Sequence, residues 1–177
     1  MRWFWIDRFL EFESGRRATA IKNVALAEPH LHDHFPGNPV MPNALVTEGL
    51  AQTGGLLVGE TTGFEARVVL AKISKIQFHF LARPGDTLTY RAEIVDTHAD
   101  GSLVTATSHV GDRLQAEAEI FFANLSGRHG TQPLFRPAEF LTTLRIMRLY
   151  DVGVAADGSR LRPPARLVEA ENALNGT

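Results

Sequence analysis

The chain of 177 residues is long enough for one globular domain, and its 44% hydrophobic and 21% charged residues exclude an intrinsically disordered protein. A net charge of -2 does not favour non-specific nucleic-acid binding, and the absence of cysteine excludes disulfides, thiolate metal sites and cysteine nucleophiles. No apolar stretch reaches the ~18 residues that a membrane span needs. We therefore expect a cytoplasmic protein with no membrane span and no nucleic-acid partner.

The N-terminal part of the chain predicts two strands followed by an ordered loop. Residues 3–13 and 17–27 alternate apolar and polar side chains on either side of Ser14-Gly15, a pattern typical of two antiparallel strands joined by a turn. Residues 28–42 contain four prolines and three histidines. Because proline at this density is incompatible with a helix or a central strand, we predict a loop there.

A buried helix is predicted next. Residues 43–59 follow a proline and are apolar on nearly every side, with Glu48 as their only charged residue. Gly49, Gly54 and Gly55 disfavour a helix by about 1 kcal/mol each relative to alanine. Their presence suggests that another backbone, such as that of a sheet wrapping the helix, approaches closely.

From residue 66 onward the hydrophobic pattern has a period of two. We predict strands, separated by turn residues, at 66–74, 75–83, 87–97, 102–111 and 113–124. Two strands, a buried helix and a run of antiparallel strands predict an α+β fold, with the helix inside a curved sheet.

The sequence divides into a domain at 1–125 and a C-terminal extension at 126–177. Within the extension we expect a linker at 126–131, a short amphipathic helix at 137–150 and a mobile tail from about residue 155. If the domain is complete by Asn124, truncation at that residue should leave a folded protein.

One histidine and one carboxylate are candidates for catalysis. His34 precedes a stiff turn-forming segment, and Glu48 follows within the apolar helix, where an ionised carboxylate is costly unless it is paired, protonated or functional. Gln52 is on the same helix face and can hold the carboxyl group. Backbone N–H groups at Asn43 and Ala44 can stabilise an enolate. These residues indicate proton transfer beside a carbonyl; the alternative is a structural glutamate and a histidine that caps a turn.

The same residues carry a family resemblance. The segment His34-Phe35-Pro36-Gly37-Asn38-Pro39-Val40-Met41-Pro42, followed by Glu48-Gly49-Leu50-Ala51-Gln52, resembles the (3R)-hydroxyacyl-carrier-protein dehydratases of fatty-acid synthesis. Asp7-Arg8, Ile21-Lys22-Asn23-Val24 and Pro84-Gly85-Asp86 are also similar to that family. The resemblance covers roughly residues 4–124.

This resemblance implies a hot-dog fold, a long helix wrapped by an antiparallel sheet, assembled as a homodimer or a trimer of dimers with each site between protomers. His34 of one chain would remove the C2 proton of a β-hydroxyacyl thioester, and Glu48 of the other would protonate the departing C3 hydroxyl. The remaining substrate-binding residues would be Gly37, Asn43, Ala44 and Gln52, the last of which would orient Glu48. The product would be a trans-2-enoyl thioester on acyl carrier protein, and no cofactor or metal is needed.

Asn43 departs from the family pattern, which has glycine after Met41-Pro42. Asparagine keeps the backbone N–H but adds a side chain, which predicts a narrower site or a different acyl group. Two alternative functions stay open. One is another hot-dog enzyme, an enoyl-thioester hydratase or a thioesterase acting on acyl-CoA; the other is a non-catalytic or specialised partner protein. The intact pair of His34 and Glu48 disfavours a thioesterase and a non-catalytic protein, but not a hydratase.

Two further patterns have ordinary explanations. His30, His32 and His34 alternate, but they lack other ligands at metal spacing, so we expect no metal site and place His30 and His32 at the loop surface. Scattered surface charge is the more common explanation for five cations that could attract an acidic carrier protein: Arg16, Arg17, Lys72, Lys75 and Arg83.

Overall fold

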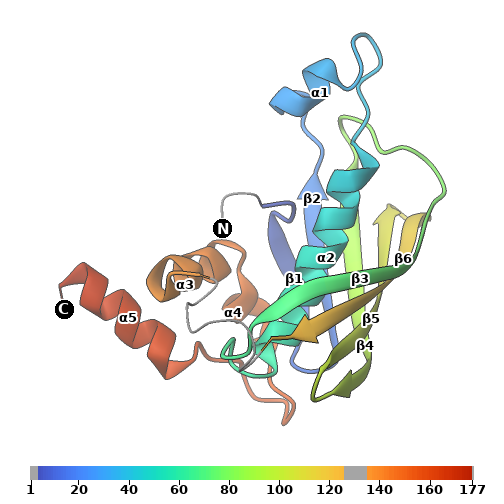
Figure 1. The fold of residues 1–177 in the computed structure, drawn as a ribbon. Coiled ribbons are helices and arrows are strands. Elements are labelled where there is room, and N and C mark those ends of the chain that lie inside the picture. Colours follow the sequence, from blue (N-terminus) through green and yellow to red (C-terminus); the bar gives the residue numbers. More distant parts are fainter. Residues whose placement is uncertain (1–3, 126–134, 177) are drawn as a thin grey trace.

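The computed structural model describes residues 4–125 and 135–176, and within them a seven-stranded sheet curves around one long helix (Figure 1). The elements up to residue 124 are β1 (Arg8–Glu13), β2 (Arg17–Asn23), α1 (Pro29–Asp33), α2 (Asn43–Glu60), β3 (Val68–Phe78), β4 (Thr87–His98), β5 (Gly101–Val110) and β6 (Arg113–Asn124). The strand order is β3-β6-β5-β4-β2-β1-β7, and every pair is antiparallel except β1 with β7 (Gly153–Val154). The predicted α+β hot-dog fold is confirmed.

Helix α2 is the centre of the fold. Ten of its 18 residues are buried, because its side chains are apolar and the sheet closes around it. The glycines admit ring side chains rather than the neighbouring backbone that the sequence suggested: a Cβ at Gly49 would lie 2.5 Å from the Tyr90 ring, and one at Gly54 would lie 3.1 Å from Phe122. Among the described residues no helix, α2 included, is long and apolar enough to cross a membrane.

Replacing Gly49 with alanine is expected to destabilise the protein by about 1–3 kcal/mol, because the fully buried Tyr90 ring has no room to move away. Gly55→Ala is the matched control. Its Cβ would lie 3.2 Å from Phe122, and the gain of about 1 kcal/mol in helix propensity opposes that contact, so the net change should be near zero. Denaturant unfolding measures both variants; equal losses would contradict the importance of the Tyr90 contact.

The chain from 66 to 83 forms one strand where the sequence predicted two. β3 pairs with β6 from Val68 to Phe78, and residues 79–86 connect it to β4 without a strand of their own. Neither glycine nor proline occurs within β3, and two shifts of register bend the strand without ending it. β3 lies at one edge of the sheet, and within the described residues only β6 pairs with it.

The proline-rich loop contains a short helix that the sequence argument excluded. Pro29 is at the first position of α1, where a backbone N–H would have no partner within the helix, so its missing N–H costs nothing. Leu31 is the buried residue of this helix. The buried Lys22 binds the Glu28 carboxylate with an Nζ–Oε1 distance of 2.5 Å. This ion pair ties the start of α1 to β2.

The extension forms helices on one side of the sheet (Figure 1). It contains α3 (Pro137–Ile146), α4 (Leu149–Val152), β7 and α5 (Ala165–Asn175). The helix predicted at 137–150 is interrupted at Arg148, whose φ of 60° is left-handed. The prediction of a mobile tail missed α5, which packs on α3 and buries Leu167. The linker predicted at 126–131 lies outside the described residues.

The hydrophobic core continues from the sheet into the extension. β7 pairs in parallel with the end of β1, and the Phe9 N–H of β1 donates to the Met147 carbonyl oxygen at 2.8 Å. Leu141 and Leu144 of α3 are fully buried and belong to the same core cluster as Phe9 and Phe12. The extension therefore shares its packing with the N-terminal strands.

Candidate active site

His34 begins a tight turn that leads towards α2. Asn38 N–H donates to the Phe35 carbonyl oxygen at 2.9 Å across Pro36 and Gly37, and the φ of 74° at Gly37 is what a type II turn requires at its third residue. His34 is half-buried, and its ring stacks on the exposed Phe35 ring with centroids 4.1 Å apart. Gly37 therefore shapes the turn that follows His34, and we call residues 34–38 the His34 turn.

Two contacts fix the His34 turn against the connection between β3 and β4. Met41 N–H donates to the Ala82 carbonyl oxygen at 2.8 Å, and Arg83 Nη1 donates to Asn38 Oδ1 at 2.7 Å. The connection thereby holds the turn in place and puts the exposed Arg83 side chain beside it.

Of the other histidines in this region, His32 is at the surface as predicted, with Nε2 3.1 Å from the Leu26 carbonyl oxygen. His30 is half-buried instead, and its ring meets the Trp5 ring edge-on with centroids 5.3 Å apart. Burial lowers the pKa of His30, against the opposing effect of the Glu28 carboxylate. Residues 4–125 and 135–176 contain no group of three or more His, Asp or Glu side chains that could hold a metal ion.

Glu48 is exposed, on a side of α2 that the described residues leave open, although the sequence predicted burial all round. Its Oε1 accepts a 2.9 Å hydrogen bond from Gln52 Nε2, and Gln52 Oε1 accepts one of 2.9 Å from the Trp5 backbone N–H. Because that N–H can only donate, the amide oxygen of Gln52 faces Trp5 and its NH2 group faces Glu48. Gln52 therefore fixes the direction of the Glu48 carboxylate.

We expect Gln52→Leu to lower kcat by about 10- to 100-fold with little change in KM, because it frees the carboxylate to turn. Gln52→Glu is the matched variant: it keeps an acceptor for the Trp5 N–H but cannot donate to Glu48. If both variants lose kcat but only Gln52→Leu has a lower melting temperature, the loss of kcat comes from the position of the Glu48 carboxylate and not from lower stability. Wild-type kcat in Gln52→Glu would contradict the positioning role.

The N-terminus of α2 offers free backbone donors. The carbonyl oxygen of Pro42 accepts the N–H groups of Leu45 and Val46, whereas the N–H groups of Asn43 and Ala44 have no acceptor among the described residues. Asn43 Oδ1 is buried and also finds no partner in that part of the chain. Two free N–H groups at the positive end of a helix can bind a carbonyl oxygen as it gains negative charge.

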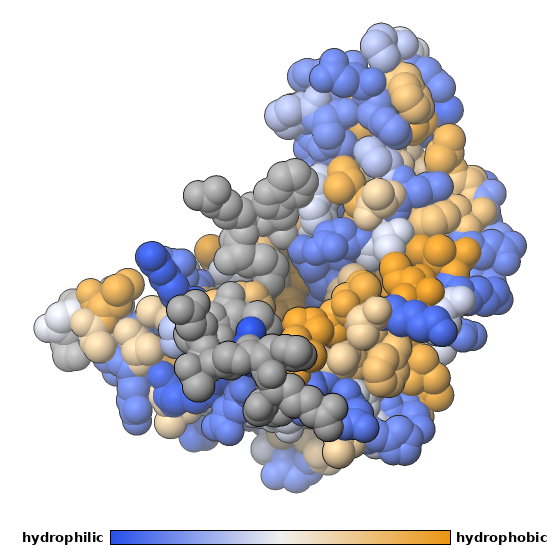
Figure 2. All heavy atoms as spheres, viewed as in Figure 1, coloured by the Kyte–Doolittle hydropathy of each residue, from blue (hydrophilic) through white to orange (hydrophobic). Residues whose placement is uncertain are grey.

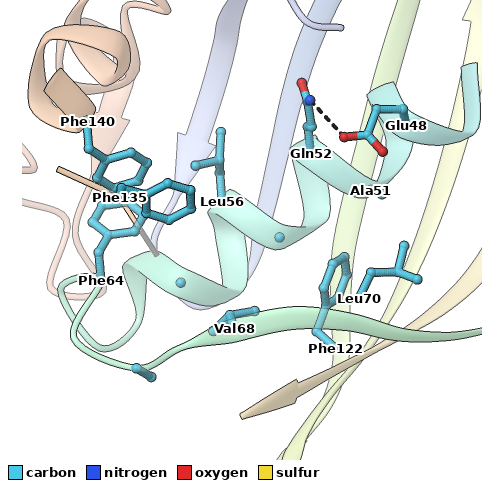
Figure 3. A pocket seen from close by; sticks show the side chains of 13 residues that line it. Glu48, Ala51, Gln52, Leu56, Phe64, Val68, Leu70, Phe122, Phe135 and Phe140 are labelled. Atoms are coloured by element: carbon cyan, nitrogen blue, oxygen red, sulfur yellow. Dashed lines mark hydrogen bonds between the residues drawn. The ribbon is translucent and has the colours of Figure 1, made fainter. Parts of the chain in front are cut away.

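A groove of about 370 Å³ begins at Glu48 and Gln52 and follows α2 towards its C-terminal end. Figure 3 shows these polar side chains at one end and three phenylalanine rings at the other. The side chains between the two ends are small or apolar and include Ala51, Gly55, Leu56, Leu70 and Phe122. In Figure 2, hydrophobic residues gather across this part of the surface, over α2 and β3. The groove therefore suits an apolar chain with a polar group at one end.

The structure brings Glu48 and Gln52 together but keeps His34 apart from them. His34 does not line the groove, and no hydrogen bond or ion pair joins it to Glu48 in the described residues. Three further residues were not predicted from the sequence. Trp5 makes its contact through its backbone, and Phe135 and Phe140 are brought to the groove by the extension.

Most of the cations considered for carrier-protein binding have partners within the chain. Arg16 and Arg17 pair with Glu13, and Lys75 pairs with Glu117 at 3.4 Å. Arg83 instead lies at the His34 turn.

The sequence of the chain is similar to a family of known proteins. Residues 3–119 match the FabA-like domain family. A 3-hydroxyacyl-[acyl-carrier-protein] dehydratase FabZ of Desulforamulus reducens is 41% identical over 119 residues, which are 67% of this chain and 84% of that protein. The FabZ of Thermomicrobium roseum is 41% identical over 121 residues, 68% of this chain and 81% of that protein.

Solved structures share the fold. The acetyl-CoA-bound smu.793 of Streptococcus mutans has a TM-score of 0.58 at 21% identity, over 73% of this chain and 96% of that one. The dehydratase heterocomplex ApeI:P of Xenorhabdus doucetiae has a TM-score of 0.51 at 17% identity, over 62% of this chain and 89% of that one. The family match ends before the extension and includes the His34 turn and all of α2. The chain belongs to the FabA-like family, with the FabZ-type 3-hydroxyacyl-[acyl-carrier-protein] dehydratases as its relatives.

Proposed function

We propose that the protein dehydrates (3R)-3-hydroxyacyl thioesters on acyl carrier protein to trans-2-enoyl thioesters, in fatty-acid or related lipid or polyketide synthesis. One observation carries the proposal: within the family match, Gln52 holds the Glu48 carboxylate at the polar end of an apolar groove. The cytoplasm is the compartment in which we expect this reaction.

The chemistry needs one base, one acid and a site for negative charge. The neutral His34 imidazole takes the C2 proton, and the electron pair of that C–H bond forms the C2–C3 double bond. The C3–O bond breaks as the protonated Glu48 carboxyl gives its proton to the hydroxyl, which leaves as water. The N–H groups of Asn43 and Ala44 stabilise the thioester oxygen while it carries enolate charge. Proton exchange with solvent then restores both catalytic groups.

The pairing of His34 with Glu48 requires a second copy of the chain. Among the described residues, Glu48 is exposed and no strand pairs with the outer edge of β3, where Leu70 is 43% exposed. A long strand edge with exposed apolar side chains is a surface that proteins normally cover. We infer a homodimer in which the two β3 edges meet and His34 of each protomer faces Glu48 of its partner.

Two other functions fit the site less well. A thioesterase uses a carboxylate to activate water and has no need of the His34 turn. A non-catalytic partner protein has no need of a carboxylate whose direction is fixed through Gln52 and Trp5. A hydratase runs the same chemistry in reverse, so the direction of the reaction is set by the substrate supplied.

The test is to incubate the full chain with (3R)-3-hydroxyacyl-carrier protein of several chain lengths and record the ultraviolet absorbance of the enoyl thioester. A thiol reagent in a parallel reaction detects thioester hydrolysis. We expect enoyl formation without thiol release. Thiol release would identify a thioesterase, and the absence of both signals from folded protein would identify a non-catalytic protein.

Arg83 provides a test of the carrier. It is exposed beside the His34 turn, so Arg83→Glu should raise KM for the carrier-protein substrate by about 10-fold more than KM for the matching pantetheine thioester, which reports the loss of the Asn38 contact alone. Arg91→Glu, exposed on β4 and away from the β3 edge, is the charge-matched control. An equal effect on both substrates would contradict a docking role for Arg83.

A further inference from the structure

The three rings at the far end of the groove form one aromatic wall, which consists of Phe64, Phe135 and Phe140. Phe135 and Phe140 stack with centroids 4.5 Å apart and planes 8° apart. Phe64 meets Phe140 edge-on, with centroids 5.0 Å apart and planes 82° apart. Phe140 stands between the other two rings and is 4% exposed. Two of the three rings belong to the extension, so the chain beyond the family match completes the groove (Figure 3).

A second cavity lies behind the aromatic wall. It measures about 100 Å³, and all three rings of the wall line it as they line the groove. Its other side is formed by Arg67, Pro137, Arg166 and Leu167. The wall is therefore a partition between two spaces, and removal of a ring would join them into one longer groove.

The surrounding structure holds the wall in place. Phe64 has a left-handed φ of 61°, and its N–H donates to the Gly59 carbonyl oxygen at 2.8 Å. A Cβ at Gly59 would lie 3.1 Å from the Phe64 ring, so glycine leaves the space that this ring occupies. Phe140 is in the first half of α3, which is anchored by the fully buried Leu141 and Leu144. The wall is thus a fixed end of the groove.

The length of the groove has the scale of a medium acyl chain. Its α2 lining runs from Glu48 to Gly59, and 11 residues at about 1.5 Å each give about 16 Å. An extended alkyl chain advances by about 1.3 Å per carbon with C–C bonds of about 1.5 Å, so about a dozen carbons fit end to end.

We propose that the aromatic wall limits the length of the acyl chain, and that the C-terminal extension thereby sets the substrate range of the enzyme. The inference rests on the proposed function, since it takes Glu48 as the reactive end of the groove. A chain that reaches the wall fills the groove, and a longer one must bend or leave its last carbons in water.

The experiment compares wild type with Phe135→Ala and Phe140→Leu. Phe135→Ala removes the less buried ring, and Phe140→Leu keeps most of the volume of a core side chain if alanine there fails to fold. Leu149→Ala in α4 is the control, because it removes an equally buried side chain of the extension that neither lines the groove nor belongs to α3. The readouts are kcat/KM against acyl length, and the melting-temperature shift given by saturated acyl-pantetheine thioesters of graded length, which cannot be dehydrated.

We expect affinity in wild type to rise with chain length and then stop rising near a dozen carbons. In Phe135→Ala the rise should continue, at about four-fold for each further CH2 admitted, and the kcat/KM optimum should move to longer chains. An unchanged length profile in both wall variants, or the same change in Leu149→Ala, would overturn the inference. Graded binding with the expected wall dependence but no enoyl formation would uphold the wall and refute the dehydratase. Enoyl formation with an unchanged length profile would uphold the dehydratase and refute the role of the aromatic wall.

Discussion

Glu48→Gln is expected to lower kcat by about 10²- to 10⁴-fold, the range that a general acid contributes. The amide has nearly the shape of the carboxyl group, and its oxygen can still accept from Gln52 Nε2. It cannot give a proton to the leaving hydroxyl. Because Glu48 is exposed in the single chain, the melting temperature should stay close to that of wild type.

Enoyl absorbance in a stopped-flow instrument measures the chemical step of this variant, and circular dichroism checks its fold. Glu60→Gln is the matched control, because Glu60 ends the same helix and does not line the groove. It should keep wild-type turnover. Wild-type turnover in Glu48→Gln would remove this residue from the mechanism, whatever the result for Glu60.

Truncation after Asn124 is expected to give an insoluble or non-cooperatively folding protein. The truncation removes Leu141, Leu144 and Leu149, which are fully buried, and each such side chain stabilises a fold by about 1.5–3 kcal/mol. A domain has only about 5–15 kcal/mol of net stability. The truncation would also uncover Phe9 and remove the strand β7 that pairs with β1. The structure thus predicts the opposite of the folded product expected from a domain that is complete by Asn124.

Removal of only the residues after Pro163 is the graded control. It takes away α5 but leaves α3, α4 and β7, so we expect a folded protein with a lower melting temperature. Solubility, size-exclusion chromatography and thermal unfolding compare the two truncations. A product of the Asn124 truncation that unfolds cooperatively at the wild-type temperature would show that the extension adds nothing to the stability of the sheet.

The parts of the fold that depend on local pattern were predictable from the sequence. The apolar run from 43 to 59 is long enough to be a helix whatever surrounds it, and strands β4, β5 and β6 are bounded by turn residues. The division of β3 into two strands was wrong, because alternation alone does not separate a bulged strand from two short ones. α1 was missed because proline was treated as excluding a helix, although at a first helical position it does not.

α5 shows a different limit. Its sequence is rich in polar and small residues, and only a buried contact such as that of Leu167 distinguishes it from a tail. α5 packs on α3, which lies far from it in sequence. Helices stabilised mainly by tertiary packing are those that a local pattern does not reveal.

The site also has contacts that the sequence predicts and contacts that it does not. The pairing of Gln52 with Glu48 follows from the spacing of four residues on one helix, and the structure has it. The second partner of Gln52 is the backbone of Trp5, 47 residues away, and no residue type signals such a contact. The exposure of Glu48 was also unexpected, since the sequence gives the polarity of a helix face but not which face the fold leaves open.

In the proposed mechanism, His34 and Glu48 of different protomers form one dehydratase site, and mixing two inactive variants tests this pairing. His34→Ala and Glu48→Gln are unfolded together and refolded at equal concentration, and enoyl formation is compared with each variant alone. A dimer of one chain of each kind has one site with both residues intact, so random pairing should restore about a quarter of wild-type activity. If refolded mixed dimers form and show no activity above the separate variants, the two residues do not act across the interface and the proposed site is contradicted.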